Sequence, residues 1–248
     1  MNMDIRDSTC GAGYAYLLAD ADNTLFDFPA GERLALTHTF EAYGLPTGEA
    51  AFAAYHRINE ALWRRLERGE VSPAALRVQR FAAFLDELGQ SRDAAAISDF
   101  FVEALGRQAI MLPGAEQAVR RWAARVPVAI VTNGIAAVQR ARIARSPIAS
   151  HVAALIISEE VGAPKPDRRM VDAALNAVGC VDPRRALLLG DSLEADVAAA
   201  ANAGIASCWF NPERLPNRTA IQPTHTVASL DEVDALLSSG KWKMESEK

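Results

Sequence analysis

Two aspartates separated by one residue, Asp20 and Asp22, stand directly after a short apolar run. That run, residues 14–19, is typical of a buried strand. Two carboxylates at the end of a strand can share one site and still point in different directions. One could attack phosphorus as a nucleophile, while the other protonates the leaving oxygen and later deprotonates water. We take Asp20 as the candidate nucleophile and Asp22 as the candidate general acid and base.

Later segments carry groups that could bind a phosphoryl group. Thr132 and Asn133 follow a second apolar run, and Lys165 lies in the loop after a third. The Thr132 hydroxyl and the backbone N–H groups near Asn133 can donate to phosphate oxygens, and Lys165 supplies a positive charge. Taken alone, Thr132 could be a helix N-cap and Lys165 a solvated surface lysine. Their occurrence in order with the aspartate pair favours the phosphate-binding interpretation.

A phosphate dianion repels an attacking carboxylate, so this chemistry needs a cation. Asp191 ends a further apolar run, and Asp196 follows five residues later. Mg²⁺ prefers oxygen ligands, and Asp20 together with Asp191 could hold it. Asp196 alone could be an ordinary acid in the first turn of a helix. We expect it instead to orient Lys165 or a metal-bound water.

The elements that position these residues alternate between strands and helices. Strands are predicted over residues 14–19, 126–131, 153–157, 186–189 and 205–210, with helical segments between the later ones. This alternation predicts an α/β fold with a Rossmann-like, doubly wound parallel sheet. In such a sheet ligands bind beyond the carboxyl ends of the strands, which is where the polar residues lie.

The segment after the first strand has a different pattern. Residues 30–106 are helix-like throughout and suit four helices. Ser72 followed by Pro73 is a typical helix start, with a capping hydroxyl and a proline in the first turn. We predict a helical domain at 30–106 inserted into a core formed by residues 1–29 and 107–248.

Composition narrows the class of protein. The chain has 248 residues, half of them hydrophobic, and a formal net charge of −5, which argues against binding a nucleic-acid polymer. Three cysteines, Cys10, Cys180 and Cys208, fit a reducing compartment better than a disulfide framework. No signal peptide or membrane-spanning apolar run is evident, so a cytoplasmic location is expected. The sequence indicates no oligomeric state.

The motifs DADNT, TNG, KP and GDSLEAD, in this order, resemble the phosphatases of the haloacid dehalogenase (HAD) superfamily. The resemblance implies a Rossmann-like core, Mg²⁺ and an aspartyl-phosphate intermediate. It gives Asp20, Asp22, Thr132, Lys165 and Asp191 the roles suggested above, and adds the backbone carbonyl of Asp22 as a metal ligand. The helical insert resembles the cap that closes over the site in this family. Asn23 stands where many members have glycine.

Further segments resemble the noncanonical pyrimidine nucleotidases of bacteria. These segments are ISEEVG at 157–162, IVTNG at 130–134 and NAGIASCWFN at 202–211. The resemblance implies a 5′-nucleotidase acting on UMP, dUMP, dTMP and noncanonical analogues. The alternative is a phosphatase of another small phosphometabolite, of the sugar phosphate or phosphoglycolate type.

Other functions suit these residues less well. A haloacid dehalogenase would need neither Mg²⁺ nor the acid at Asp22. A phosphorylated switch module would lack the helical insert, and a binding module without catalysis would not need every reacting group. In or beside the insert, six residues could contact a base or sugar, or else pack the helices and face solvent, and we expect the second. These residues are Phe28, His38, Tyr55, His56, Trp63 and Arg64.

Overall fold

The computed structural model describes residues 13–238, which form two compact units. The first unit comprises residues 13–27, 111–133 and 147–238, and the second comprises residues 28–110 and 134–146. Cys10 lies outside the described residues, whereas Cys180 and Cys208 are free thiols. The division into a core of residues 1–29 and 107–248 and an inserted domain at 30–106 stays a prediction.

The first unit contains a six-stranded sheet in the order β3-β2-β1-β4-β5-β6, and every neighbouring pair is parallel. The chain builds outward from β1 to one side and then returns to build the other side, so the switch in direction lies between β1 and β4. The predicted doubly wound parallel sheet is confirmed. The strands are β1 (Tyr16–Ala19), β2 (Val128–Thr132), β3 (Ala154–Ile157), β4 (Ala186–Gly190), β5 (Ala206–Phe210) and β6 (His225–Val227).

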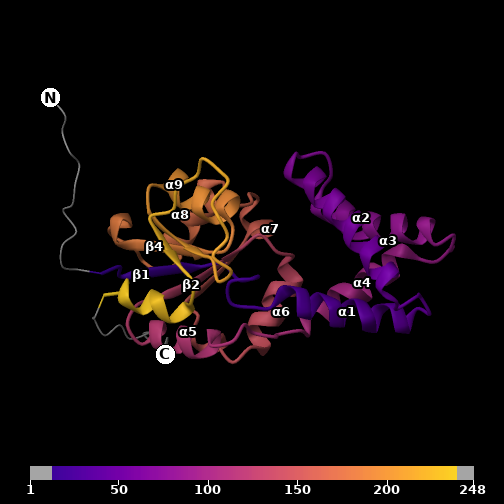
Figure 1. Ribbon diagram of the computed structural model, residues 1–248, viewed down its shortest axis with the longest axis horizontal. Helices are drawn as coiled ribbons and strands as arrows, with labels where there is room; N and C mark the ends of the chain where they lie inside the picture. Colours follow the sequence, from indigo (N-terminus) through magenta and orange to yellow (C-terminus); the bar gives the residue numbers. More distant parts are fainter. Residues whose placement is uncertain (1–12, 239–248) are drawn as a thin grey trace. The chain divides into compact units, whose positions relative to one another are not determined.

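Helices cover both faces of this sheet, with α8 and α9 on one side and α5 on the other (Figure 1). The α8 and α9 face buries Leu18 of β1 and Leu188 of β4. The two strands beside β1, which are β2 and β4, are buried along their whole length, as expected for strands covered on two faces. The helices of this unit are α5 (Ala115–Ala123), η1 (Ala149–His151), α7 (Ser158–Val161), α8 (Arg168–Ala177), η2 (Pro183–Arg185), the π-helical η3 (Leu193–Val197), α9 (Ala198–Ala203) and η4 (Leu230–Ala235).

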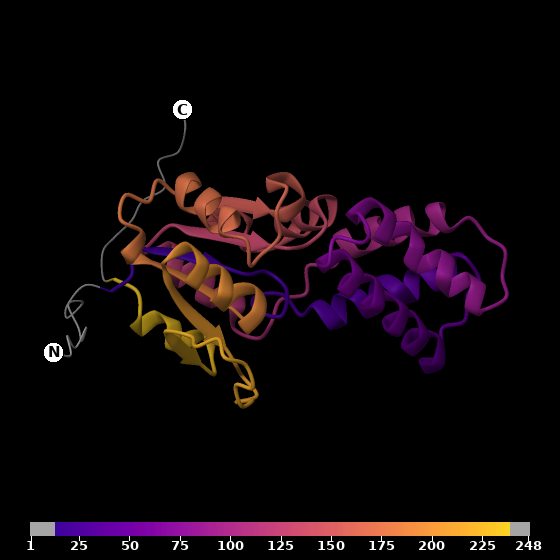
Figure 2. The ribbon, with the colours of Figure 1, turned by 90° about the horizontal axis from the view of Figure 1, so that it is seen from above.

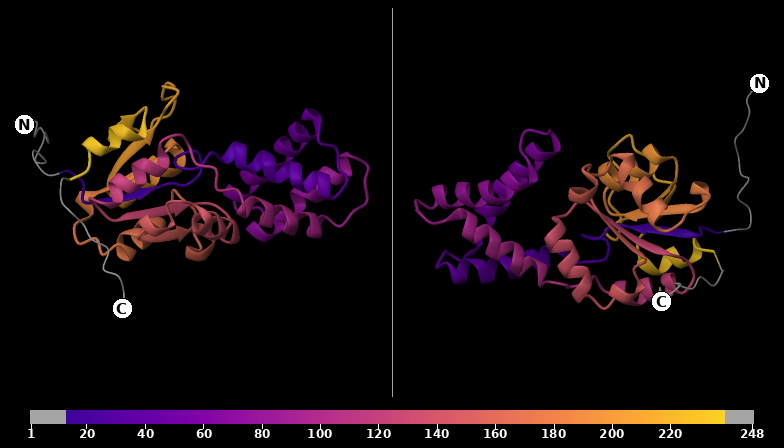
Figure 3. Two further views of the ribbon diagram at one scale, coloured as in Figure 1. Left: turned by 90° about the horizontal axis from the view of Figure 1, so that it is seen from below. Right: turned by 180° about the vertical axis from the view of Figure 1, so that it is seen from behind.

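The second unit is a group of helices, seen in Figures 2 and 3. Tyr55 lies fully buried in its interior, with ring contacts to Phe40, Phe81, Phe84 and Phe101. Tyr55 therefore packs the helices, as expected. The helices are α1 (Phe28–Ala42), α2 (Glu49–Glu67), α3 (Pro73–Glu87), α4 (Ala94–Gly106) and α6 (Ala136–Arg145).

The other candidates for base or sugar contact have varied surroundings. Phe28 and Trp63 pack against the hydrophobic cluster of this unit, and His38 is exposed. His56 is half-exposed, with Nδ1 lying 3.5 Å from a carboxylate oxygen of Glu32. Arg64 is exposed and pairs with Glu60 at 3.7 Å.

Local capping explains where the helices of this unit begin. The Ser72 hydroxyl accepts a hydrogen bond from the Ala75 N–H at 3.2 Å, and Pro73 occupies the first turn, so the predicted start of α3 is confirmed. Asp93 caps α4 by accepting from the Ala95 and Ala96 N–H groups. Among residues 13–238, no helix is long and apolar enough to cross a membrane.

Helix α6 groups with the second unit although it follows β2 in the chain. It packs on α4 at a point where a Cβ added to Gly106 would lie 3.1 Å from the Ala141 Cβ, so the helix backbones approach closely. Arg142 reinforces this packing, because its Nε donates to the Gln108 carbonyl at 3.1 Å. The chain therefore passes from the first unit to the second directly after the phosphate-binding candidates Thr132 and Asn133.

Candidate active site

The candidate residues lie where three adjacent strands end. Asp20 follows β1, Thr132 is the last residue of β2, and Asp191 follows β4, with β1 between the other two strands. Because the strands are parallel, their carboxyl ends meet at one edge of the sheet. Backbone pairing continues to the nucleophile candidate, whose N–H donates to the Leu189 carbonyl at 2.8 Å.

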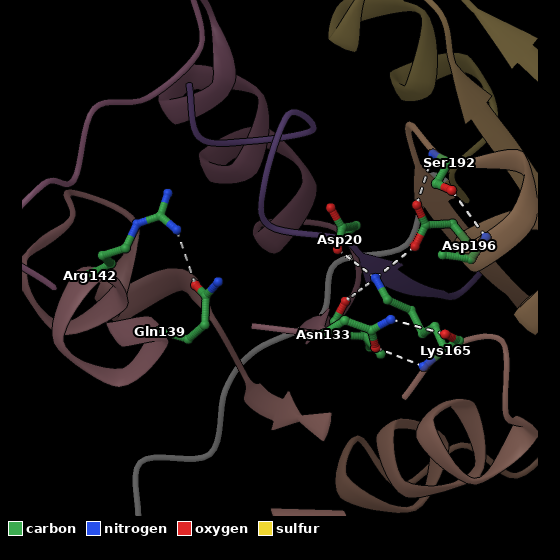
Figure 4. A network of polar contacts seen from close by, with 9 residues as sticks. Asp20, Asn133, Gln139, Arg142, Lys165, Ser192 and Asp196 are labelled. Atoms are coloured by element: carbon green, nitrogen blue, oxygen red, sulfur yellow. Dashed lines mark hydrogen bonds and ion pairs between the residues drawn. The ribbon is translucent and has the colours of Figure 1, made fainter. Parts of the chain in front are cut away.

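The Lys165 ammonium joins the candidates from separate segments (Figure 4). It donates to Asp20 Oδ1 at 2.5 Å, to Asp196 Oδ1 at 2.7 Å and to the Val131 carbonyl at 2.7 Å. An ammonium has three donors, and all three are used here. Burial lowers the pKa of Lys165, but the charges of Asp196 and Asp20 outweigh burial and raise it overall. Lys165 therefore stays protonated.

The Asn133 side chain holds the main chain of the same lysine. Its amide nitrogen donates to the Lys165 carbonyl at 3.0 Å, and its oxygen accepts from the Lys165 N–H at 2.7 Å. Both ends of the amide are thus occupied by the loop after β3. The sequence predicted a phosphate-binding role for Asn133, and these two contacts engage its side-chain amide with Lys165. Thr132 is buried at the end of β2.

Asp196 also makes two different contacts. While Oδ1 accepts from Lys165, Oδ2 accepts from the Ser192 N–H at 3.0 Å. Gly190 makes room for this carboxylate, because a Cβ at that position would lie 2.2 Å from the Asp196 Cγ. Neither Ser192 nor Gly190 was singled out from sequence as a contact of Asp196.

Three carboxylates at this edge could hold a cation. One oxygen each of Asp20, Asp191 and Asp196 lies within 4.8 Å of the others. Burial and then the charge on Asp196 raise the pKa of Asp191 to about 6. Burial also raises the pKa of Asp20 well above its ordinary value; Lys165 opposes this, and the neighbouring carboxylates add to it. The surplus of buried negative charge fits a hard divalent cation with oxygen ligands.

Asp22 belongs to the same electrostatic environment. It is half-buried in the turn after β1, and its charge raises the pKa of both Asp20 and Asp191. The next residue, Asn23, has a φ of 62°, in the left-handed region that glycine and asparagine adopt most readily. Asparagine therefore satisfies the turn at the position where glycine is frequent in the resembled family.

Comparison with known proteins agrees with this fold. Residues 15–204 match the hydrolase family described as haloacid dehalogenase-like hydrolase. The chain belongs to this family, and it is a phosphoric monoester hydrolase.

Two relatives of known activity are similar over most of their length. Pyrimidine 5′-nucleotidase YjjG of Escherichia coli is 32% identical over 90% of this chain and 97% of its own. Pyrimidine 5′-nucleotidase PynA of Streptococcus pneumoniae is 33% identical over 89% and 93%. A crystal structure of the HAD-hydrolase YfnB from Bacillus subtilis, bound to magnesium, is 31% identical. It has a TM-score of 0.83 and covers 91% of this chain and 99% of its own.

Proposed function

We propose that the chain hydrolyses phosphomonoesters by attack of the Asp20 carboxylate on phosphorus. Lys165 holds Oδ1 of Asp20, so Oδ2 is the oxygen that forms the new bond. The bond between phosphorus and the ester oxygen breaks, which gives an aspartyl-phosphate and an alcohol. The observation that carries this proposal is the Asp20–Lys165–Asp196 network, which holds a buried carboxylate beside a fixed positive charge.

Asp22 serves as the general acid and then the general base. It gives a proton to the departing ester oxygen, and it later takes a proton from the water that attacks the phosphorus of the intermediate. This second step releases inorganic phosphate and restores the Asp20 carboxylate. The half-buried position of Asp22 in the turn after β1 suits a group that exchanges protons with water.

The transferring phosphoryl group is bound by donors from two strand ends. Lys165 supplies a fixed positive charge, Thr132 a hydroxyl, and Asn133 its backbone N–H. The Asn133 amide contributes indirectly, because it holds the Lys165 backbone at two points.

We further propose Mg²⁺ as the cation of this site, held by Asp20, Asp191 and the backbone carbonyl of Asp22. Both oxygens of Asp196 are already engaged by Lys165 and the Ser192 N–H, which makes Asp196 a supporting residue. When bound, Mg²⁺ neutralises the charge that would otherwise keep a phosphate dianion from a carboxylate. Support also comes from the magnesium bound in the YfnB structure.

We propose pyrimidine nucleoside 5′-monophosphates as substrates, namely UMP, dUMP, dTMP and noncanonical analogues. The support is the similarity to the two nucleotidases over about nine-tenths of each chain. Another small phosphometabolite is the alternative, because residues at the strand ends determine the reaction and leave the alcohol unspecified. A cytoplasmic location stays a prediction.

A substrate panel tests the proposal. Phosphate release is measured on purine and pyrimidine nucleotides, sugar phosphates and phosphoglycolate, each with Mg²⁺ and with EDTA. We expect the highest kcat/KM on pyrimidine nucleotides and no turnover with EDTA. A preference for a sugar phosphate would overturn the nucleotide assignment, and full activity in EDTA would overturn the metal. Halide release from a haloacid without added metal would favour the dehalogenase alternative.

A further inference from the structure

One peptide group in the active site is held from both sides. It joins Asp191 to Ser192. Its carbonyl accepts a hydrogen bond from the Trp209 indole Nε1 at 2.9 Å, and its N–H donates to Asp196 Oδ2 at 3.0 Å. Because a peptide group is planar, two hydrogen bonds on its opposite edges fix the orientation of the whole plane. Figure 4 shows the Ser192 and Asp196 side of this arrangement.

We propose that Trp209 is a positioning residue for the cation site, which it serves by holding the Asp191–Ser192 peptide and thereby orienting the Asp191 carboxylate. The inference rests on the proposed role of Asp191 as a metal ligand. It goes beyond that role because Trp209 lies on a different strand and touches no reacting atom named above.

The sheet brings the indole to this position. Trp209 lies on β5 beside β4, directly opposite Gly190 in the parallel register. Gly190 carries no side chain, and the indole reaches one residue further along the chain to the Asp191 carbonyl. Asp191 thus stands between the hydrogen-bonded end of β4 and a peptide held on both edges. Little rotation of its backbone is left, so its side chain leaves the main chain in one direction.

Loss of the indole N–H would release this constraint. Trp209 is only 9% exposed and Asp191 is half-buried, so the Asp191 carbonyl would lose its donor in a place that water only partly reaches. The peptide would then turn toward water or another donor, and the Asp191 carboxylate would turn with it. The same peptide contacts Asp196, but Lys165 keeps its own hydrogen bonds to Asp196, Asp20 and the Val131 carbonyl, so we expect the loss to fall on the cation ligand.

The test is Trp209→Phe, which keeps an aromatic ring and removes the donor. Mg²⁺ affinity is measured by isothermal titration calorimetry without substrate, and by the Mg²⁺ concentration that gives half-maximal phosphatase activity. We expect both to weaken by about 10-fold or more, as for other residues that support a metal ligand. At saturating Mg²⁺ we expect kcat to recover to within about twofold of wild type, since no reacting group has changed.

Trp122→Phe is the matched control. Trp122 is fully buried in α5, and its indole nitrogen has no hydrogen-bond partner among the described residues. This variant loses the same atoms from a buried ring without losing a hydrogen bond. We expect a lower melting temperature and unchanged Mg²⁺ affinity. Replacing Trp209 with 3-benzothienylalanine, which has the shape of tryptophan and no N–H, gives a second test if the phenylalanine variant folds poorly.

Asp191→Asn, measured in parallel, tests the proposed cation site separately from the role of Trp209. If Asp191→Asn loses Mg²⁺ binding while both Trp209 variants keep wild-type affinity, the role of Trp209 is overturned and the proposed cation site stands. If Asp191→Asn binds Mg²⁺ as wild type does, the proposed site itself fails, and the inference falls with it. If Mg²⁺ affinity weakened equally in the Trp209 and Trp122 variants, the effect would come from lost packing, and the positioning role of Trp209 would be overturned.

Discussion

Two of the buried cationic side chains, one in each unit, have contrasting surroundings. In the first unit, Lys165 is 5% exposed and donates to three oxygens, two of them carboxylates. In the second unit, Arg80 is 2% exposed and makes a long hydrogen bond, from Nη1 to Asn59 Oδ1 at 3.4 Å. The Nε and Nη2 atoms of Arg80 have no hydrogen-bond partner among the described residues. Its guanidinium lies instead over the rings of Phe101 and Phe81, at 4.7 and 5.3 Å.

The contrast separates two ways of burying positive charge. Lys165 is matched by anions, and removing it would leave those anions facing one another in a buried site. Arg80 is covered mainly by aromatic faces, which attract a cation more weakly than a carboxylate does. The first arrangement, around Lys165, is costly to break and suits a catalytic site. The second can be replaced by an apolar side chain at little cost. The predictions below test this difference, beginning with the largest expected effect.

Asp20→Asn should reduce phosphate release by at least about 10⁴-fold, because an amide is a poor nucleophile and the aspartyl-phosphate cannot form. The variant keeps the size of the side chain, so circular dichroism should show the wild-type fold. Single-turnover assays with the best substrate of the panel give the measurement. Residual activity above about one per cent of wild type would mean that the nucleophile lies elsewhere.

Lys165→Met should lower kcat by about 100-fold or more, because the phosphoryl group loses its fixed positive charge. The same change should reduce the free energy of unfolding by about 3 kcal/mol, since Asp20 and Asp196 lose their shared cation. Steady-state kinetics and urea unfolding give the two values. A variant as stable as wild type would show that this ion-pair network does not hold the site together.

Asn133→Ala should have an intermediate effect. It removes two hydrogen bonds to the Lys165 backbone and leaves the ammonium contacts in place. Two such bonds are together worth about 1–2 kcal/mol, so we expect kcat/KM to fall by about 10-fold. A loss as large as that of Lys165→Met would instead place the Asn133 side-chain amide on the substrate.

Arg80→Met should have the smallest effect. Methionine fills similar apolar space and removes a buried charge with few partners, so we expect the free energy of unfolding to change by less than about 1 kcal/mol. Urea unfolding beside Lys165→Met makes the comparison direct. A loss of about 3 kcal/mol or more would show that the aromatic surroundings hold Arg80 as firmly as carboxylates hold Lys165.

The contrast also explains what the sequence could predict. The strand-end residues were found because a buried parallel strand is a short apolar run, and the polar residue after it must lie at the shared edge. The same rule found five strands. It missed β6, whose three residues are too few to show a pattern, and likewise the four-residue α7.

Contacts that depend on the path of a loop were beyond sequence reasoning. The Asn133 amide reaches the backbone of Lys165, 32 residues away, and only the folded loops bring them together. Trp209 supports Asp191 through a carbonyl, a group that every residue has, so residue types carried no signal. The burial of Arg80 had no signal in the sequence, because arginine on an amphipathic helix usually faces water.

Gly190 bears on how this chain can vary. Its backbone conformation is open to any residue, but the space for a Cβ is filled by the Asp196 carboxylate. Even alanine would displace that carboxylate, and with it the groups that hold Lys165 and the Asp191–Ser192 peptide. In a mutational scan, position 190 would therefore tolerate as little as the aspartates themselves, although it has no functional group. A residue can thus be indispensable to an enzyme for the volume it leaves empty.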